Sequence, residues 1–349
     1  MKPIVILAGL ASSLVLSGCV AAAAPVVAAG AIGQKGLHHK RSRQPLPTAA
    51  ASAPPSSAVP ASGSVPPGMQ YLYGSGEAAA ISTQAYLGLA DFLQARASDF
   101  AVGHPVNSVV LAPDATLAAP KFLTCTSGQR PAVVLDIDET ALLNLGYEAD
   151  DSQRGGPYDQ RRWDRWEASG MTAVEPVPGA VEALRSARAA GVAVIFNSNR
   201  SAMNAAATSW ALTIAGLGPA VHGDTLWLKG DAGSTGSGKD ARRWAISARY
   251  CVIAMVGDQL GDFSDLFNAA DMTPMQRRQA IALPLVRMLW GHGWFVLPNP
   301  VYGTGLKGNI DDVFPKNRRW IDPGPPMAVA PTQPPATVPN PTAGAPTPK

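Results

Sequence analysis

The sequence predicts an α/β fold in which helices cover both faces of a doubly wound parallel sheet. Short apolar runs with the character of buried strands alternate with segments whose apolar residues recur at helical spacing. Strands separated by helices pair in parallel, because each helix carries the chain back to the same edge of the sheet. The expected strands are residues 132–135, 192–196, 225–228 and 252–256, and the helices are residues 181–190, 202–214, 240–248 and 262–269.

Two further segments complete the predicted domain. Residues 77–100 place Ala85, Leu89 and Leu93 on one helical face, so we expect an N-terminal helix. Residues 144–175 are too polar and too long for a simple crossover, and they carry two tyrosines and two tryptophans. We expect this segment to form a small, partly helical cap, with some of its aromatic rings packed against the core.

The start of the chain has the pattern of an export signal. A basic first turn and the apolar run 4–16 are typical of a signal peptide, here residues 1–18. The small residues before Cys19 resemble a bacterial lipobox, which implies cleavage before Cys19 and lipid on its side chain. Val20 after the cysteine is similar to signals that permit sorting to an outer membrane, facing the periplasm. The alternative is an ordinary secretory signal that is cut near residues 21–24.

Composition sets the domain boundaries. The chain has 349 residues, of which 46% are hydrophobic and 15% charged, as expected for one sizeable core with disordered ends. Residues 19–67 are rich in Ala, Pro and Ser and predict a tether, and residues 323–349 predict a disordered Pro-rich tail. The folded domain is then residues 68–322. A net charge of +3 is too small to indicate nucleic-acid binding.

Two carboxylates stand at the end of the first expected strand. Asp136 and Asp138 follow the run 132–135, and residues two apart in a strand point the same way. Ligands bind at this edge of open α/β sheets. Two carboxylates there repel each other, so a cation or a shared proton is expected. The pattern fits Mg²⁺-dependent phosphoryl transfer, in which one carboxylate attacks phosphorus and the second handles a proton. A strand end with two solvated acids is the alternative.

The second expected strand also ends in polar groups. Ser198, Asn199 and Arg200 follow residues 192–196 and present a hydroxyl, an amide and a guanidinium. These groups can donate hydrogen bonds to phosphate oxygens, and Arg200 can do so in a bidentate manner. They equally fit a helix cap that follows a core strand.

A lysine and two further acids follow later in the chain. Lys239 suits the role of a cation beside a phosphorylated aspartate, and Lys229 is the alternative. Asp258 ends the strand 252–256, and Asp262 follows it by four residues. Acids at the ends of two strands with a lysine between them form a combined pattern. This pattern is more specific for a phosphoryl-transfer site than any one of the residues alone.

In this order the pieces resemble the four motifs of the haloacid dehalogenase (HAD) superfamily of phosphatases, between residues 71 and 320. The pieces are Asp136-Ile-Asp138-Glu-Thr140, Ser198, Lys239 and Asp258. The resemblance implies a Rossmann-like sheet with Asp136 as nucleophile and Asp138 as acid and base. It implies that Ser198 and Lys239 bind phosphoryl oxygens.

The same resemblance implies a Mg²⁺ cofactor. Its expected ligands are the Asp136 side chain, the Asp138 backbone carbonyl and Asp258. Asp262 is then an auxiliary acid near the metal.

Finer features are similar to the class C nonspecific acid phosphatases, which are bacterial and often lipid-anchored. They are Phe-Asn-Ser-Asn-Arg at 196–200, Gly-Asp-Gln-Leu-Gly-Asp-Phe at 257–263 and the segment 295–303 with Tyr302. The resemblance implies small phosphomonoester substrates, such as nucleoside monophosphates or aryl phosphates. We expect Asn199, Arg200, Tyr302 and Trp163 (or Trp166) to contact them, with the two aromatic rings around a flat base.

The chain departs from this class at three positions. Gln259 stands where the class usually has Asn, and Gly305 where it usually has Trp. Asn197 replaces a more apolar residue inside the second strand. These departures bear on substrate preference more than on the type of reaction.

Cys125 and Cys251 are the cysteines left after Cys19. A pair in an exported protein can form a disulfide. In the superfamily's sheet order the strands that follow these cysteines are neighbours, which implies that the two sulfurs lie close together. Two buried thiols are the alternative.

Other functions fit the sequence less well. Residues 233–239 match most of a phosphate-binding P-loop, but Asp240 stands where that loop needs Ser or Thr. A surface lipoprotein that keeps this fold only to bind a ligand is a rival hypothesis, although a pure binder gains nothing from a nucleophile. Phosphoryl transfer to an alcohol instead of water is the second rival.

Overall fold

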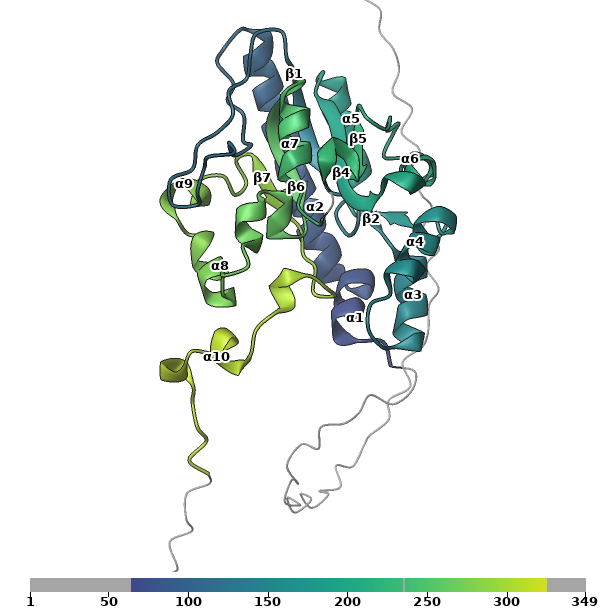
Figure 1. The fold of residues 1–349 in the computed structure, drawn as a ribbon, viewed down its shortest axis with the longest axis vertical. Helices are drawn as coiled ribbons and strands as arrows, with labels where there is room; N and C mark the ends of the chain where they lie inside the picture. The colour runs from purple at the N-terminus through teal and green to yellow at the C-terminus, as the bar shows by residue number, and fades with distance from the viewer. Residues whose placement is uncertain (1–63, 235, 325–349) are drawn as a thin grey trace, which may run out of the picture. The chain divides into compact units, whose positions relative to one another are not determined.

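The computed structural model describes residues 64–234 and 236–324. Its main sheet has five parallel strands in the order β5-β4-β1-β6-β7 (Figure 1). These strands are β1 (Arg130–Leu135), β4 (Ala193–Ser201), β5 (Leu226–Lys229), β6 (Tyr250–Gly257) and β7 (Trp294–Val296). The predicted doubly wound parallel sheet is confirmed. The predicted signal peptide with Cys19, and almost all of the predicted tether and tail, lie outside the described residues.

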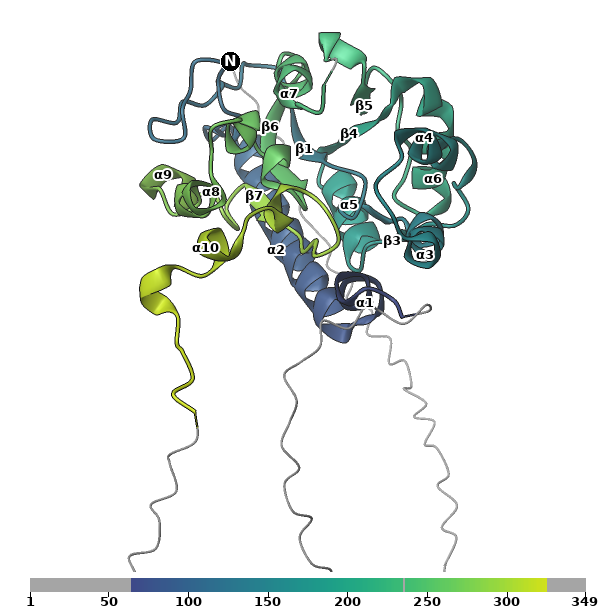
Figure 2. The ribbon, with the colours of Figure 1, turned by 60° about the horizontal axis from the view of Figure 1, so that its bottom comes forward.

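Helices pack on both faces of the sheet. α2 (Gly76–Ala101), α5 (Ala180–Ala189) and α6 (Ala205–Ile214) contribute to one hydrophobic cluster, and α7 (Asp240–Ser247) contributes to the other. The long helix α2 lies behind the strands in the view of Figure 1 and runs diagonally below most of them in Figure 2. Val133 and Leu135 of β1 belong to the first cluster, and Ala132 and Val134 belong to the second. Because β1 is buried on both faces, its sequence is a continuous apolar run.

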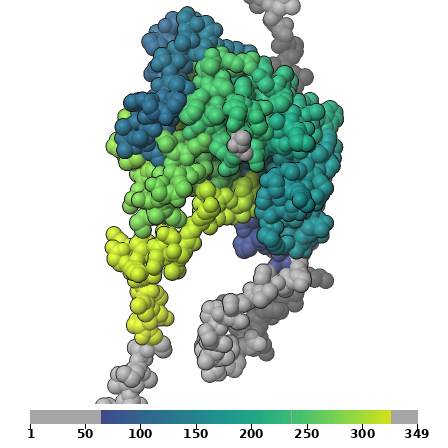
Figure 3. Space-filling view, in the orientation of Figure 1, coloured from purple at the N-terminus to yellow at the C-terminus, as the bar shows by residue number. Residues whose placement is uncertain are grey.

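The predicted cap is confirmed as a small, partly helical unit. It holds α3 (Leu145–Arg154) and α4 (Gln160–Ser169), and its base is an antiparallel pair of β2 (Leu142–Leu143) and β3 (Glu175–Pro176). α4 begins after Asp159, whose carboxylate accepts the first free N–H groups of the helix. In the space-filling view the cap, in teal, adjoins the yellow C-terminal segment (Figure 3).

The predicted helix at residues 262–269 is wrong. Two separate 3₁₀ turns, η3 (Leu260–Asp262) and η4 (Asp265–Asn268), occupy this stretch. The Asp265 carboxylate accepts the backbone N–H of Lys239 at 2.8 Å, which anchors the turn to the start of α7. A side chain that bonds backbone groups elsewhere competes with continuation of a helix.

Outside the cap, one strand and four α-helices of the described residues were not predicted, because each is too short to show a periodic pattern. They are β7 and the helices α1 (Pro67–Gly74), α8 (Pro274–Ala280), α9 (Pro284–Arg287) and α10 (Ile310–Val313). Within the described part of the chain, no helix combines the length and the apolar character that crossing a bilayer requires.

Cys125 and Cys251 form a disulfide, with their Cα atoms 5.0 Å apart, so the pairing implied by the resemblance is confirmed. Cys251 lies near the amino end of β6, and Cys125 lies in the segment before β1. The bond therefore joins chain segments 126 residues apart at the edge of the sheet away from Asp136.

We expect Cys125→Ser to lower the free energy of unfolding by about 2–4 kcal/mol, because the unfolded chain is no longer cross-linked. Urea denaturation followed by circular dichroism measures this loss. The wild-type protein in reductant should match the variant. A variant with the same unfolding midpoint as the oxidised wild-type protein would show that the bond contributes nothing to stability.

Candidate active site

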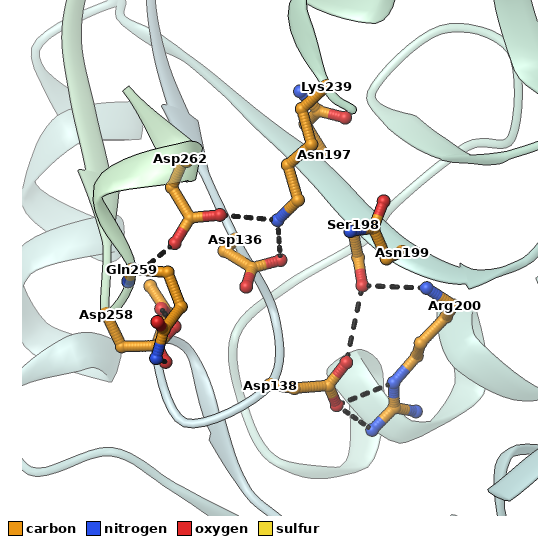
Figure 4. Close-up of polar contacts among 12 residues, drawn as sticks. Asp136, Asp138, Asn197, Ser198, Asn199, Arg200, Lys239, Asp258, Gln259 and Asp262 are labelled. Carbon is orange, nitrogen blue, oxygen red and sulfur yellow. Dashed lines mark hydrogen bonds and ion pairs between the residues drawn. The ribbon is translucent and has the colours of Figure 1, made fainter. Parts of the chain in front are cut away.

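Three carboxylates meet at the carboxyl edge of the sheet. Asp136 directly follows β1, Asp258 directly follows β6, and these two strands are parallel neighbours. Asp262 comes from the turn η3 just beyond. One oxygen from each of the three carboxylates lies within 4.8 Å of the others, and Figure 4 shows their convergence.

Lys239 connects two of these acids. Its Nζ lies 2.6 Å from Oδ1 of Asp136 and 2.7 Å from Oδ1 of Asp262, and the side chain is buried. Burial alone would lower the pKa of Lys239, but the charges of Asp136 and Asp262 outweigh it and raise that pKa. Of the two lysines considered from the sequence, the structure brings Lys239 to Asp136. Lys229 ends β5 and lines the same cavity as Asp136, but it forms no ion pair with that carboxylate.

The three carboxylates suit a hard divalent cation. Burial is the main cause that raises the pKa of Asp136, and Asp262 and Asp258 add to it against the opposing charge of Lys239. Burial and then Asp262 raise the pKa of Asp258 to about 7. More negative charge gathers here than one lysine offsets, and oxygen donors are those that Mg²⁺ prefers. Asp262, expected only as an auxiliary acid, is within the same cluster.

Asp138 is held by a separate set of donors. Nε and Nη2 of Arg200 donate to its Oδ1 at 2.9 and 2.8 Å, and Nδ2 of Asn144 donates to the same oxygen at 2.9 Å. The hydroxyl of Ser198 donates to its Oδ2 at 3.3 Å. The orientation of this carboxylate is therefore fixed from two sides (Figure 4).

The role expected for Arg200 needs correction. It was expected to grip substrate phosphate, but its buried guanidinium bonds Asp138 and Asn144. The reason is that β4 does not stop at residue 196 and runs to Ser201, so no helix cap forms at Ser198. Residues two apart in a strand point the same way, which sends Ser198 and Arg200 together toward Asp138.

A buried arginine lies on the opposite side of β4. Arg242 donates to Oδ1 of Asn197 at 2.7 Å and to Oδ1 of Asn199 at 2.6 Å, and its third partner is the Ser234 hydroxyl at 3.1 Å. Burial lowers its pKa to about 10, and the charge of Asp136 opposes this shift. Asn197, which departs from the apolar residue of the class, therefore supplies an acceptor to a buried cation. No pattern in the sequence indicates this contact.

The loop after β7 is fastened to the acid cluster. Nδ2 of Asn299 donates to Oδ2 of Asp258 at 2.7 Å, while its Oδ1 accepts the backbone N–H of Val301 at 2.9 Å. Nε2 of Gln259 donates to the same carboxylate oxygen at 3.0 Å and to the backbone carbonyl of Tyr302 at 3.2 Å. Gln259, which stands where the class usually has Asn, thus joins Asp258 to this loop. Asn299 was not predicted as a site residue.

Glu139 holds the tip of the same loop. The Tyr302 hydroxyl donates to Oε2 of Glu139, and the backbone N–H and Nδ2 of Asn144 both donate to Oε1 at 3.0 Å. Glu139 has a left-handed backbone conformation with φ of 54°, which residues other than glycine rarely adopt. Burial, and then the charge of Asp138, raise its pKa to about 8.

A cavity of about 580 Å³ opens over these groups. Its walls include Asp136, Asp138, Lys239, Asp258, Asp262, Asn199, Trp163 and Tyr302. Trp163 packs edge-on against Tyr147, with ring centroids 4.8 Å apart. Trp166, the alternative to Trp163, donates its indole N–H to Asn144 at 3.2 Å and is not part of the described cavity wall.

Comparison with known proteins identifies the family. A family model described as HAD superfamily, subfamily IIIB (Acid phosphatase), matches residues 94–305. The chain belongs to this family. This chain is similar to the class C acid phosphatase from Bacillus anthracis, with 25% sequence identity and a TM-score of 0.53 between the two structures. The match covers 68% of this chain and 84% of that chain. The class C acid phosphatase from the same species with tungstate bound is 23% identical, with a TM-score of 0.52 over 70% and 92%. The resemblance found in the sequence is confirmed, and the protein is a phosphatase.

The raised pKa values predict how the metal-free phosphatase responds to pH. The pKa is raised from 3.8 to about 7 for Asp258 and from 4.5 to about 8 for Glu139. Between those limits the folded state binds more protons than the unfolded state, so the free energy of unfolding falls as pH rises. In EDTA we expect a melting temperature several degrees lower at about pH 8 than at about pH 5. Asp258→Asn should shrink the difference, and a higher melting temperature at the higher pH would contradict the prediction.

Proposed function

We propose that this phosphatase hydrolyses small phosphomonoesters in a Mg²⁺-dependent reaction that passes through an aspartyl phosphate on Asp136. The observation that carries the proposal is the ion pair between Lys239 and Asp136, which lies on the cavity wall beside Asp258 and Asp262. A nucleophilic carboxylate has to be ionised and oriented, and the ammonium group supports both.

In the first step an oxygen of Asp136 forms a bond to phosphorus while the bond from phosphorus to the ester oxygen breaks. Asp138 gives a proton to the departing alcohol. In the second step Asp138 takes a proton from water, whose oxygen attacks phosphorus and releases Asp136 with inorganic phosphate. Arg200 and Asn144 keep Asp138 in one orientation for both steps. Lys239 and Ser198 are the proposed donors to the phosphoryl oxygens.

The proposed metal ligands are Asp136, Asp258 and the backbone carbonyl of Asp138, with Asp262 within reach. Bound Mg²⁺ supplies positive charge that offsets these carboxylates and the phosphoryl oxygens. The donor set supports this choice, because its side-chain groups are carboxylates within 4.8 Å of one another.

Trp163 and Tyr302 are the proposed contacts for the leaving group. Both line the cavity, and the hydroxyl of Tyr302 is anchored on Glu139, which fixes its ring. Stacking on such rings contributes about 1–3 kcal/mol per base and tolerates any base. We therefore propose a preference for nucleoside and aryl phosphates over small aliphatic esters. Asn199 lines the same cavity and is a further proposed contact for the substrate.

A substrate panel tests the function. With Mg²⁺, p-nitrophenyl phosphate and nucleoside monophosphates should release phosphate with a kcat/KM about tenfold or more above that of glycerol phosphate. Tyr302→Ala should reduce this difference in kcat/KM between the substrates. Tyr302→Phe, which keeps the aromatic ring, should preserve the difference. Binding without phosphate release would instead indicate a non-catalytic binder. Transfer to an added alcohol without hydrolysis would indicate a phosphotransferase.

We further propose that the phosphatase acts in the cell envelope, with a lipid on Cys19 that anchors it to the outer membrane on the periplasmic side. The proposal rests on the lipobox-like start of the sequence. The disulfide between Cys125 and Cys251 supports an oxidising compartment.

A further inference from the structure

Glu148 is a buried carboxyl group that the proposed reaction does not use. It lies on the cap helix α3, is 6% exposed, and forms part of the cavity wall. Its carboxylate has no hydrogen-bond donor among the described residues. The nearby guanidinium of Arg162 is engaged by Asp151. Glu148 therefore offers two acceptor oxygens to whatever occupies the cavity.

Such a group requires a donor from the ligand. A buried carboxylate without hydrogen bonds costs free energy that a bound donor recovers. Burial, and then the charge of Asp151, raise the pKa of Glu148 to about 7, and Asp138 contributes in the same direction. Glu148 adjoins Tyr147 on α3, and Tyr147 packs against Trp163 of the cavity wall, so Glu148 lies with the aromatic groups proposed to contact the leaving alcohol.

The neighbours of Glu148 restrict the chemistry of that donor. Asp138 and Asp151 line the same cavity, and the nearby cation Arg162 is paired with Asp151 and Asp150, so a second phosphate of the substrate would meet a net negative charge there. Neutral hydroxyl groups satisfy Glu148 without that repulsion. Hydroxyl groups of the leaving alcohol, a few bonds beyond the ester oxygen, would lie near Glu148.

We infer that Glu148 is a specificity residue that accepts hydrogen bonds from hydroxyl groups of the leaving alcohol, so that the phosphatase favours phosphate esters of sugars and polyols, ribonucleotides included. This inference rests on the proposed function. It adds a polar requirement to the aromatic walls: Trp163 and Tyr302 bind a flat ring, and Glu148 binds the hydroxyl-bearing part between that ring and the phosphate.

Matched nucleotides test the inference. We compare a ribonucleoside 5′-monophosphate with its 2′,3′-dideoxy analogue, which has the same base and phosphate but no sugar hydroxyls. At a pH above about 7, where Glu148 is ionised, the wild-type enzyme should show a kcat/KM about tenfold or more higher for the ribonucleotide, as expected for hydrogen bonds to a charged acceptor. Glu148→Ala should remove this preference, and Glu148→Gln, which keeps one acceptor oxygen, should retain part of it. Glu182→Gln, an exposed change of the same kind on α5, is the matched control and should leave the preference intact.

Hydrolysis of p-nitrophenyl phosphate, which has no such hydroxyls, separates the possible outcomes. Wild-type-like hydrolysis of this ester by Glu148→Ala, with the ribonucleotide preference lost, supports the inference. An equal loss on all three esters would mean that Glu148 is structural, and an equal rate of the wild-type enzyme on both nucleotides would also overturn the inference. A Glu148-dependent preference for phosphoethanolamine over the ribonucleotide would assign Glu148 to an ammonium group instead. A wild-type enzyme inactive on every ester would reject the proposed function itself.

Discussion

Asp136→Asn is expected to reduce kcat on p-nitrophenyl phosphate by about four orders of magnitude or more, because an amide oxygen cannot attack phosphorus as a carboxylate does. The fold should persist, since the substitution removes one charge from a crowded group of acids whose burial already raises the pKa of Asp136. Initial rates and a melting curve for the same preparation measure both effects.

Asp271→Asn is a suitable control for this change. Asp271 is exposed and lies outside the cavity wall, so the same chemical substitution there should leave kcat unaltered. Near-native hydrolysis by Asp136→Asn would show that another group is the nucleophile.

Removal of the metal is expected to lower the rate by at least about 100-fold, and added Mg²⁺ should restore it. Asp258→Ala should resemble chelation, because it deletes one of the three clustered carboxylates and leaves Asn299 and Gln259 without their shared acceptor. Rates after dialysis against EDTA, followed by Mg²⁺ titration, measure the effect.

The same titration of Asp258→Ala separates a metal ligand from a structural residue. A lost ligand should shift the Mg²⁺ requirement to higher concentration or abolish rescue, whereas Asp271→Ala should titrate like the wild-type enzyme. Full activity of the wild-type enzyme in EDTA would reject metal dependence. Restoration by Zn²⁺ but not by Mg²⁺ would point to a different metal chemistry.

The acids at strand ends were predictable because their positions follow from local sequence alone. A buried strand has to be apolar, and the first polar residues after it emerge at the edge of the sheet. Asp136 after β1 and Asp258 after β6 meet for this reason, since those strands are neighbours. The parallel sheet and the cap follow from equally local signals, namely alternation of elements and a long polar insertion.

Side chains whose direction depends on distant contacts were not predictable in the same way. Arg200 contacts Asp138 because β4 continues past residue 196, and the sequence does not show where a strand stops once its residues become polar. Asn299 reaches Asp258 from a loop after β7, a strand too short to leave a pattern. Glu148 lies in the cap, where only the three-dimensional structure shows which helix face lines the cavity.

Transfer of the phosphoryl group to Asp136 is tested most directly by trapping the intermediate. The enzyme is mixed with p-nitrophenyl phosphate and Mg²⁺, quenched in acid within a single turnover, digested, and analysed by mass spectrometry. We predict that the peptide that contains Asp136 gains the mass of one phosphoryl group, that fragmentation places it on Asp136, and that Asp136→Asn shows no such gain. Rapid turnover with no phosphoryl group on Asp136 at any quench time would contradict the proposed mechanism.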